Sequence, residues 1–198
     1  MANLWRLKHC VRQLTGLVTE FGGNEAKLLQ MAEFTLADLI AYDDWLPDAF
    51  AKPDPVHYRQ YLLYADPMDR FSVVSFVWGP GQSTPIHDHT VWGLIGVLRG
   101  GETCTAYTLG DQGLIPGPAC RLMPGKVDAV SPRIGDIHQV SNTFDDQVSI
   151  SIHVYGGDIG AIQRHVFDPD NGHTKPFTSH YSSSVLPNLW GQFQGEAL

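Results

Sequence analysis

Residues 81–100 read GQSTPIHDHTVWGLIGVLRG and place two histidines, His87 and His89, inside a β-like run. Side chains on a strand repeat every two residues, so both imidazoles are expected to point one way and Asp88 the other way. Two imidazoles on one face can share a metal ion. A solvated strand face carries such a pair equally well, so this stretch alone does not distinguish a metal site from ordinary polar residues.

The chain resembles the cupin barrels, because two signatures of that family occur in the right order. The first signature is a glycine, five residues, His-x-His and a later glycine, and it spans residues 81–100. The second is a glycine, two residues, a histidine, three residues and an asparagine, and it spans residues 135–142. In cupins these segments lie on facing strands of a small barrel, and their histidines bind one divalent metal ion. The resemblance therefore implies a metal site made of His87, His89 and His138.

The N-terminal part of the chain has the pattern of helices. Apolar residues at three- and four-residue intervals from Trp5 to about Phe21 predict an amphipathic helix that ends at Gly22. A second helix is expected after Asn24, which is a plausible N-cap, and residues 35–42 are expected to form a separate short helix.

Beyond residue 52, glycines and prolines separate short apolar runs, a pattern typical of a β-barrel or sandwich. Strands are expected at residues 58–65, 71–78, 86–98, 102–109, 126–130, 137–141, 147–155 and 164–167. Arg99, Gly100 and Gly101 form the clearest turn, and a hairpin is predicted there. The expected fold is mainly β, a cupin with a helical N-terminal segment. Its parts are helices in residues 1–52, a barrel in 53–181 and a C-terminal arm in 182–198, within a single structural domain.

Composition argues against several classes of partner. The formal net charge is −8 and the acidic and basic residues are scattered, so the chain lacks a basic footprint for nucleic acid. No apolar run approaches the length of a membrane span, and three cysteines without paired spacing suit a reducing compartment. We therefore expect a cytoplasmic protein that binds neither nucleic acid nor membranes, and the sequence leaves its oligomeric state open.

Two departures from the cupin pattern concern the metal site. Gly93 stands where the usual first signature has a glutamate ligand, and Arg133 replaces the proline expected before Gly135. Three histidines without a carboxylate carry no protein charge, so the full +2 charge of a metal ion is left to attract an anionic ligand. Imidazoles suit iron, zinc, copper and nickel alike, so the ligand type does not choose the metal.

Residues 149–155 read SISIHVY and alternate strictly between polar and apolar side chains. Ser151, His153 and Tyr155 fall on one face of the expected strand, and the apolar residues fall on the other. A half-exposed strand would alternate in the same way. Inside a barrel that holds a metal, however, the polar face can form a relay in which His153 bridges the two hydroxyl groups and Tyr155 is held over the metal.

This polar row after a three-histidine cupin site resembles the thiol dioxygenases of the cysteine dioxygenase family. Those enzymes use non-haem Fe(II) and O2 to oxidise a small thiol, which implies Fe(II) as the cofactor here. Because Gly93 replaces a cross-linking cysteine, the chain is most similar to the bacterial 3-mercaptopropionate dioxygenases, and Tyr155 is expected to be unmodified. The implied reaction adds both atoms of O2 to the sulfur of 3-mercaptopropionate and yields 3-sulfinopropionate, with Ser151, His153 and Tyr155 as catalytic residues.

The carboxylate of such a substrate needs a cationic partner, for which Arg59, Arg164 and Arg133 are the candidates. The bacterial enzymes have a glutamine in the early strand and an arginine nine residues past the tyrosine, which the resemblance places at Gln60 and Arg164. The choice between Arg59 and Arg164 stays open, as does the physiological thiol. The alternatives are a cysteine dioxygenase that forms cysteine sulfinate and a non-catalytic metal-binding cupin.

Overall fold

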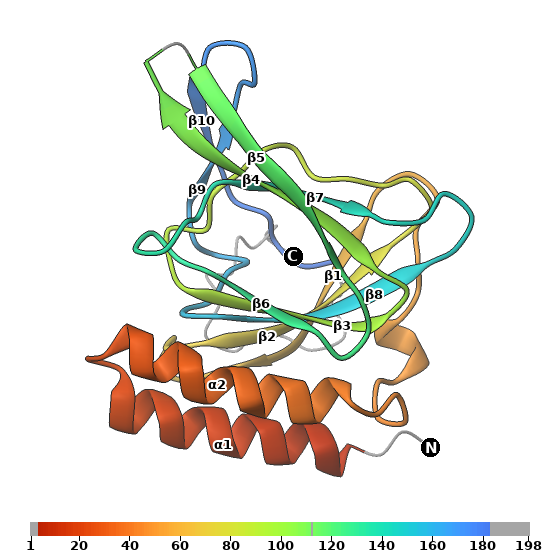
Figure 1. Ribbon diagram of the computed structural model, residues 1–198. Coiled ribbons are helices and arrows are strands. Elements are labelled where there is room, and N and C mark those ends of the chain that lie inside the picture. The colour runs from red at the N-terminus through yellow and green to blue at the C-terminus, as the bar shows by residue number, and fades with distance from the viewer. Residues whose placement is uncertain (1–3, 112, 183–198) are drawn as a thin grey trace, which may run out of the picture.

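A computed structural model describes residues 4–111 and 113–182, so the predicted arm beyond residue 182 lies outside the described part. Two helices precede strands that form two facing β-sheets (Figure 1). The helices are α1 (Trp5–Phe21) and α2 (Glu25–Ile40), with a short 3₁₀ helix η1 (Asp48–Phe50). The strands are β1 (Arg59–Ala65), β2 (Ser72–Trp78), β3 (Gly93–Arg99), β4 (Glu102–Gly110), β5 (Gly113–Leu122), β6 (Val127–Val130), β7 (His138–Asn142), β8 (Ser149–Tyr155), β9 (Arg164–Phe167) and β10 (Thr174–Phe177).

The two helices follow from local sequence signals. Helix α1 has the bounds that its apolar periodicity predicts, and before α2 the side chain of Asn24 accepts a hydrogen bond from the backbone N–H of Lys27. Helix α2 continues without a break through Thr35, so the prediction of a separate short helix there is wrong. No glycine or proline interrupts residues 25–40, and the buried side chain of Thr35 belongs to the same packed face as its neighbours.

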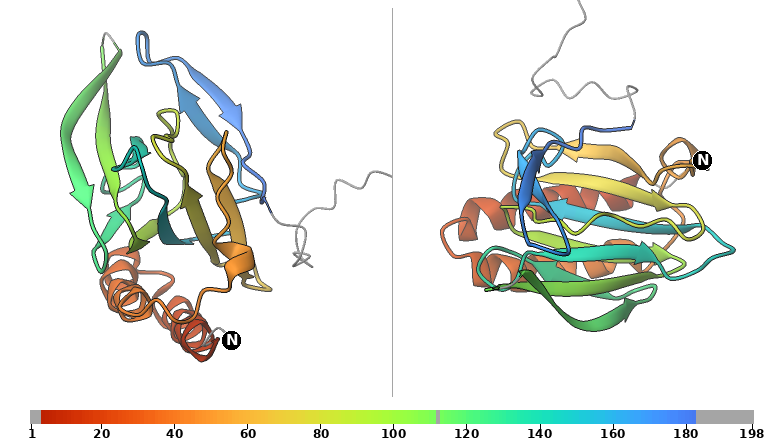
Figure 2. Two further views of the ribbon diagram at one scale, coloured as in Figure 1. Left: turned by 90° about the vertical axis from the view of Figure 1, so that its right-hand side faces the viewer. Right: turned by 90° about the horizontal axis from the view of Figure 1, so that it is seen from above.

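The strands are arranged in two main sheets. The larger sheet has the order β1-β2-β8-β3-β6 and the smaller has the order β5-β4-β7, while β9 and β10 pair separately. The two sheets face each other across the interior of a barrel (Figure 2). Helices α1 and α2 lie against the outer face of the larger sheet (Figure 1). This arrangement confirms the expected cupin barrel with a helical N-terminal segment.

The turn after β3 does not form the predicted hairpin. Strand β3 ends at Arg99 in the larger sheet, whereas β4 starts at Glu102 in the smaller sheet. Gly100 has a φ of +69°, and a side chain at this position would run into Ser149. The turn is therefore a corner that passes the chain from one sheet to the other, and glycine is required by both its left-handed backbone and its close packing.

Three strands differ from the sequence prediction. Strands β5 and β10 are present although neither was expected, because prolines and glycines such as Pro116, Gly117 and Pro118 in β5 are typical of loops. Strand β5 tolerates these residues because it lies at an edge and, among the described strands, pairs only with β4. The expected strand over residues 86–98 is too long, since β3 begins only at Gly93.

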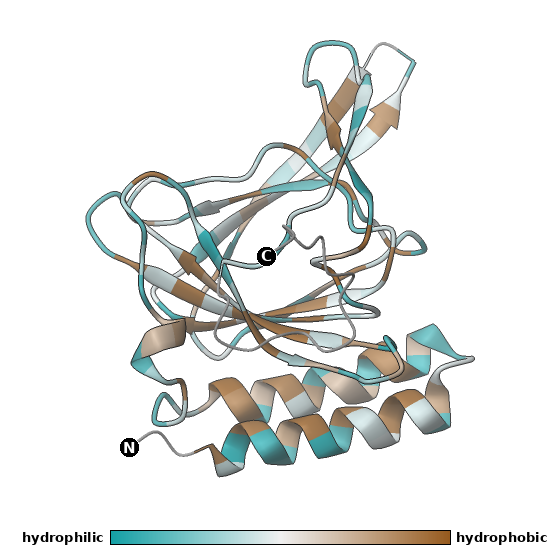
Figure 3. Ribbon diagram, turned by 180° about the vertical axis from the view of Figure 1, so that it is seen from behind, coloured by the Kyte–Doolittle hydropathy of each residue, from teal (hydrophilic) through white to brown (hydrophobic). Residues whose placement is uncertain are grey.

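Two clusters of buried apolar side chains hold the layers together. The larger cluster joins the helices to the larger sheet and includes Leu14, Leu36 and Leu94, and the smaller lies inside the barrel and includes Phe76 and Trp78. Strand β8 lies between them and is buried along its whole length, with its isoleucines and valine in the cluster on the helix side. Figure 3 shows hydrophobic segments on the helices and on the strands above them. The polar face of β8 is therefore directed into an enclosed interior.

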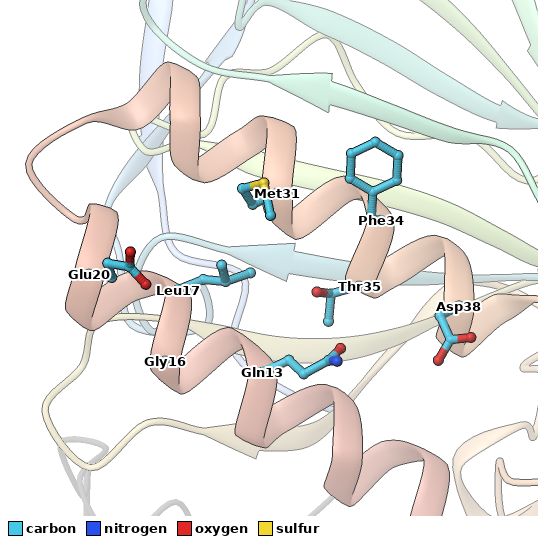
Figure 4. A pocket seen from close by; sticks show the side chains of 8 residues that line it. All are labelled: Gln13, Gly16, Leu17, Glu20, Met31, Phe34, Thr35 and Asp38. Atoms are coloured by element: carbon cyan, nitrogen blue, oxygen red, sulfur yellow. The ribbon is translucent and has the colours of Figure 1, made fainter.

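A groove of about 420 Å³ runs between α1 and α2 (Figure 4). Its lining comes from both helices and consists of Gln13, Gly16, Leu17, Glu20, Met31, Phe34, Thr35 and Asp38. Among the described residues, neither helix has both the length and the hydropathy needed to cross a membrane. The groove belongs to the helical layer, so the larger sheet separates it from the interior of the barrel.

Candidate metal centre

Three buried histidines converge inside the barrel. His87, His89 and His138 are 8%, 1% and 4% exposed, and each offers a ring nitrogen within 4.8 Å of the others. His87 and His138 exchange backbone hydrogen bonds, with N–H to carbonyl oxygen distances of 2.9 and 3.0 Å. These bonds bring the two signature segments side by side.

The His-x-His pair converges although it does not lie on a regular strand. His87 takes part only in isolated β-bridges, outside the named strands. Asp88 nevertheless points elsewhere, because its carboxylate accepts hydrogen bonds from the backbone N–H of His165 at 2.7 Å and contacts its ring Nδ1 at 2.8 Å. The side-chain alternation predicted for this segment is therefore present without the strand that was expected to carry it.

Each of the three histidines uses its Nδ1 atom in a contact within the protein. The contacts are His87 Nδ1 to the Pro85 carbonyl oxygen at 3.0 Å, His89 Nδ1 to Asp136 Oδ1 at 2.8 Å and His138 Nδ1 to Cys104 Sγ at 3.4 Å. Such partners fix the orientation of a ring and leave Nε2 as the atom that can bind a metal ion. The three Nε2 atoms are therefore the candidate donors.

Burial keeps the three imidazoles neutral. It lowers the pKa of His87 to about 3, and it also lowers the pKa of His89 and of His138. Neighbouring histidines act in the same direction, because like charges oppose protonation. Neutral imidazole is the form that binds a transition metal, and a set of nitrogen donors suits a divalent ion. The residues present therefore fit such an ion.

Asp136, which neither cupin signature singles out, adds a negative charge beside this cluster. Besides its contact with the ring of His89, it accepts hydrogen bonds through Oδ2 from the backbone N–H groups of His89 at 3.0 Å and Thr90 at 2.9 Å. Burial acts to raise the pKa of Asp136, but these hydrogen bonds outweigh it and lower the pKa. The expectation of an uncharged site holds for the donors alone, since a carboxylate lies directly behind one of them. In the sequence, the feature that could have pointed to Asp136 is its position two residues before the predicted ligand His138.

The polar row of β8 forms a continuous hydrogen-bond chain. Ser151 Oγ lies 2.7 Å from His153 Nε2, and His153 Nδ1 lies 2.8 Å from Tyr155 Oη. Trp78 donates its indole N–H to Ser151 Oγ at 3.2 Å. At the other end, the ring of Tyr155 stacks on His89 with centroids 5.3 Å apart. The chain therefore ends on a phenol beside the histidine cluster, as the alternation of this segment predicts.

Gly93 lies directly opposite Tyr155 in the ladder between β3 and β8. A Cβ atom at this position would be 2.9 Å from Tyr155 Cδ1 and 3.0 Å from Val130 Cγ2. The glycine therefore leaves room for the phenol ring against the strand. The thiol of Cys104, on β4, contacts His138 Nδ1 and not the phenol.

The candidate carboxylate-binding residues occupy different environments. Arg59 pairs with Asp54, and its side chain is 40% exposed. The next residue on β1, Gln60, lies opposite the interior residue Phe76 and is buried, with no hydrogen-bond partner for Oε1 in the described part of the chain. Arg164 is only 3% exposed, and its Nε and Nη2 atoms likewise have no partner among the described residues.

Arg164 shares the interior with the histidines. Its charge helps to lower the pKa of His87 and His89, after the larger effect of burial. Its guanidinium carbon lies 4.5 Å from the ring centroid of Phe177, a cation–π contact. Arg133, in contrast, has a side chain that is 73% exposed. The structure therefore places one of the three candidate arginines inside the barrel and the other two at its surface.

Comparisons with known proteins agree with this site. The family described as cysteine dioxygenase type I matches residues 31–168, which is well over half of the chain. Cysteine dioxygenase type 1 of Danio rerio is 27% identical over 135 residues, covering 66% of this chain and 64% of that protein. The enzyme of the same name from Rattus norvegicus is 26% identical over 171 residues, covering 82% of this chain and 80% of that protein.

Among solved structures, an uncharacterised conserved protein with a double-stranded β-helix domain from Klebsiella pneumoniae superposes with a TM-score of 0.43. It is 18% identical, and the match covers 68% of this chain and 97% of that one. The family match rests on the sequence and spans both signature segments. The chain therefore belongs to the cysteine dioxygenase type I family, whose members are thiol dioxygenases and hence oxidoreductases.

Proposed function

We propose that this chain oxidises the sulfur of a small thiol carboxylate with O2, and that 3-mercaptopropionate is its substrate and 3-sulfinopropionate its product. The observation that carries the proposal is the buried guanidinium of Arg164, which lies in the barrel that holds the three histidines and has two nitrogen atoms without a hydrogen-bond partner in the described part of the chain. A buried cation without partners is costly, and a bound carboxylate offsets that cost by accepting its N–H groups. This interior is therefore suited to an anionic ligand.

Arg164 and Gln60 bind the substrate carboxylate in this proposal. The Nε and Nη2 atoms of a guanidinium lie on one edge and can donate two parallel hydrogen bonds to a carboxylate. Gln60 adds a buried amide whose N–H₂ group is a further donor. The pairing of Arg59 with Asp54 and its partly exposed side chain support the choice of Arg164 over Arg59.

Fe(II) held by His87, His89 and His138 would supply the redox chemistry with O2 and would stabilise the substrate sulfur as a thiolate. The chain's own contribution is to exclude water and to place the Tyr155 phenol beside the reacting sulfur. Burial raises the pKa of Tyr155, so the phenol keeps its proton at neutral pH. Through His153, which contacts it at 2.8 Å, the Oη atom can exchange a proton with the interior.

The surroundings of Arg164 favour 3-mercaptopropionate over cysteine, which carries an additional ammonium group. The buried guanidinium of Arg164 repels a second positive charge placed beside it. Asp88 is a carboxylate whose charge acts on Arg164, but it already contacts the ring of His165 and so is not free to pair with the ammonium group of cysteine. Cysteine remains the alternative substrate, since the relatives named above are cysteine dioxygenases.

The direct test is to measure O2 uptake and sulfinate formation by the iron-loaded protein with each thiol under air. We expect one sulfinate per O2 and a higher kcat/KM for 3-mercaptopropionate than for cysteine. A higher value for cysteine would establish the alternative substrate. Absence of sulfinate from every small thiol would refute the proposal as a whole and leave a non-catalytic metal-binding cupin.

The carboxylate clamp is tested by replacing each arginine in turn. Loss of a charge-assisted pair of hydrogen bonds costs about 2–3 kcal/mol, so Arg164→Ala is expected to lower kcat/KM by about 100-fold, mostly through KM. Arg59→Ala is the matched control and should leave kcat/KM close to wild type, because Arg59 lies outside the barrel. Thermal melts of both variants check folding. A larger loss in Arg59→Ala would reassign the clamp.

A further inference from the structure

Glu102 is a buried carboxylate without a role in the reaction proposed above. It lies at the start of β4 and is 2% exposed. Its Oε1 atom has no hydrogen-bond partner among the described residues. In the smaller sheet Glu102 lies opposite Asn142 of β7, the strand that carries His138 four pairs along on the same face. Burying a carboxylate without partners is costly, so this position calls for a physical reason.

The imidazole of His153 is the group that this carboxylate faces. Glu102 Oε1 lies 3.9 Å from His153 Nε2, and the two side chains are 3% and 4% exposed. Nε2 is the nitrogen that contacts Ser151, whereas Nδ1 contacts the phenol of Tyr155. Glu102 therefore acts on the side of the imidazole that points away from the phenol.

A carboxylate in this position selects between the two neutral forms of the imidazole. One ring nitrogen carries the proton and the other is an acceptor. The negative charge of Glu102 favours the proton on the nearer nitrogen, Nε2, because the positive end of the N–H dipole then faces the carboxylate. Ser151 Oγ has two acceptor lone pairs, so it can accept this N–H together with the indole N–H of Trp78.

We propose that Glu102 is a positioning residue that holds His153 in its Nε2–H form and so directs the hydroxyl proton of Tyr155 toward His153 Nδ1. The lone pairs of Tyr155 Oη are then presented to the bound thiol. When the thiol gives its proton to Oη, the phenol proton moves to Nδ1, and the imidazolium that results faces the Glu102 carboxylate. This step rests on the proposed function, but the form of His153 in the resting protein does not.

The form of His153 is measured by ¹⁵N nuclear magnetic resonance on the full-length protein loaded with Zn²⁺, which is diamagnetic. The His153→Gln variant identifies the resonances of this ring. We expect the wild-type protein to show a protonated Nε2 and an unprotonated Nδ1. Glu102→Gln removes the charge with little change of shape and should raise the fraction of the Nδ1–H form, while Glu102→Asp should keep the wild-type form. A wild-type ring with its proton on Nδ1 would overturn the proposal.

Turnover provides the second measurement. Among the described residues, the contact that Glu102 makes with the site is the one with His153. Glu102→Gln is therefore expected to lower kcat by about tenfold with little change in KM, and Glu102→Asp should restore part of the loss. Thr103→Val is the matched control, because the neighbouring Thr103 points out of the barrel and contacts Thr143. Wild-type kcat and wild-type His153 form in Glu102→Gln would refute the proposal. If no thiol is oxidised by any variant, the proposed function fails and the resonance measurement still decides the role of Glu102.

Discussion

At the scale of single residues, Asp136 binds both the ring and the backbone of a histidine in the cluster. One carboxylate oxygen contacts His89 Nδ1, and the other accepts the backbone N–H groups of His89 and Thr90. Thr90 has a φ of +61°, a left-handed conformation that is unfavourable for a threonine. Asp136 therefore stabilises a strained turn and also fixes the orientation of the candidate ligand His89.

Asp136→Asn is expected to weaken metal binding. The amide keeps the size of the side chain but loses the charge that orients His89 and raises the basicity of its ring, so affinity for Fe(II) or Zn²⁺ should fall by about 10–100-fold. Competition with a chelator measures the affinity. The control is Asp146→Asn, which removes the same charge from an exposed residue and should bind metal as the wild type does. Equal affinities in all three proteins would show that Asp136 acts on the turn alone.

The pKa of His87 predicts how stability depends on pH in the metal-free protein. Burial holds this pKa at about 3 in the folded chain, against about 6.5 in an unfolded one. Between these values the unfolded chain binds a proton that the folded chain excludes, so the free energy of unfolding rises with pH across this window. We expect stability to fall as the pH is lowered from about 6.5 to 4.

Urea unfolding of the metal-free protein at several pH values measures this dependence. His87→Gln removes the titrating ring and should show a shallower slope than the wild type. His57→Gln replaces an exposed histidine and should keep the wild-type slope. A wild-type stability that does not change over this range would contradict a neutral, buried His87.

At the scale of elements, the pairing of β3 with β8 positions the phenol. Gly93 and Tyr155 are directly opposite each other, and the absence of a side chain at Gly93 lets the ring lie against the strand. Gly96, further along β3, faces the helices instead, since a Cβ atom there would meet the side chains of Ile40 and Leu36. The two glycines thus serve opposite faces of one strand.

Gly93→Ala and Gly96→Ala separate the position of the phenol from general packing. Each substitution forces a methyl group into a tight space and is expected to destabilise the fold by about 1–3 kcal/mol. Only Gly93→Ala should also reduce kcat, because its methyl group displaces the ring of Tyr155. Thermal melts and turnover with the preferred thiol give the two readouts. Equal losses of kcat in both variants would mean that stability, not the position of Tyr155, limits turnover.

At the scale of the whole molecule, the helices stabilise the sheet from outside while the chemistry lies inside the barrel. Leu36 of α2 is fully buried in the cluster that joins the helices to the larger sheet, whereas Phe34 on the same helix is 68% exposed. Strand β8 connects the two sides, since its apolar face belongs to that cluster and its polar face to the interior. Helix packing therefore supports the strand that carries the hydrogen-bond chain.

Leu36→Ala is expected to lower the free energy of unfolding by about 2–5 kcal/mol, because it leaves a cavity between the helix and the sheet. Phe34→Ala is the matched control and should change stability by less than about 0.5 kcal/mol. Urea unfolding measures both. Metal affinity of the folded Leu36→Ala protein should equal that of the wild type, and a parallel loss of affinity would show that the helices act directly on the histidines.

Much of the architecture could be predicted from local patterns. The apolar periodicity of residues 5–21 predicts the helix that forms there, and the polar–apolar alternation of residues 149–155 predicts a strand with one apolar and one polar face. The two signatures likewise single out histidines that do converge. The wrong predictions also have local causes. The prolines in β5 are typical of a loop, and Gly100 is typical of a hairpin turn although it lies at a corner between two sheets.

What the sequence alone determined is therefore the set of short-range periodicities and motifs, because helical and strand repeats involve residues close together in the chain. Only the tertiary structure decided which arginine enters the barrel, since Arg59 and Gln60 are adjacent and the register of β1 alone turns one outward and the other inward. It also decided that Asp136 and Glu102 meet His89 and His153. Those pairs are far apart in the chain, and their contacts depend on how segments pack across the barrel.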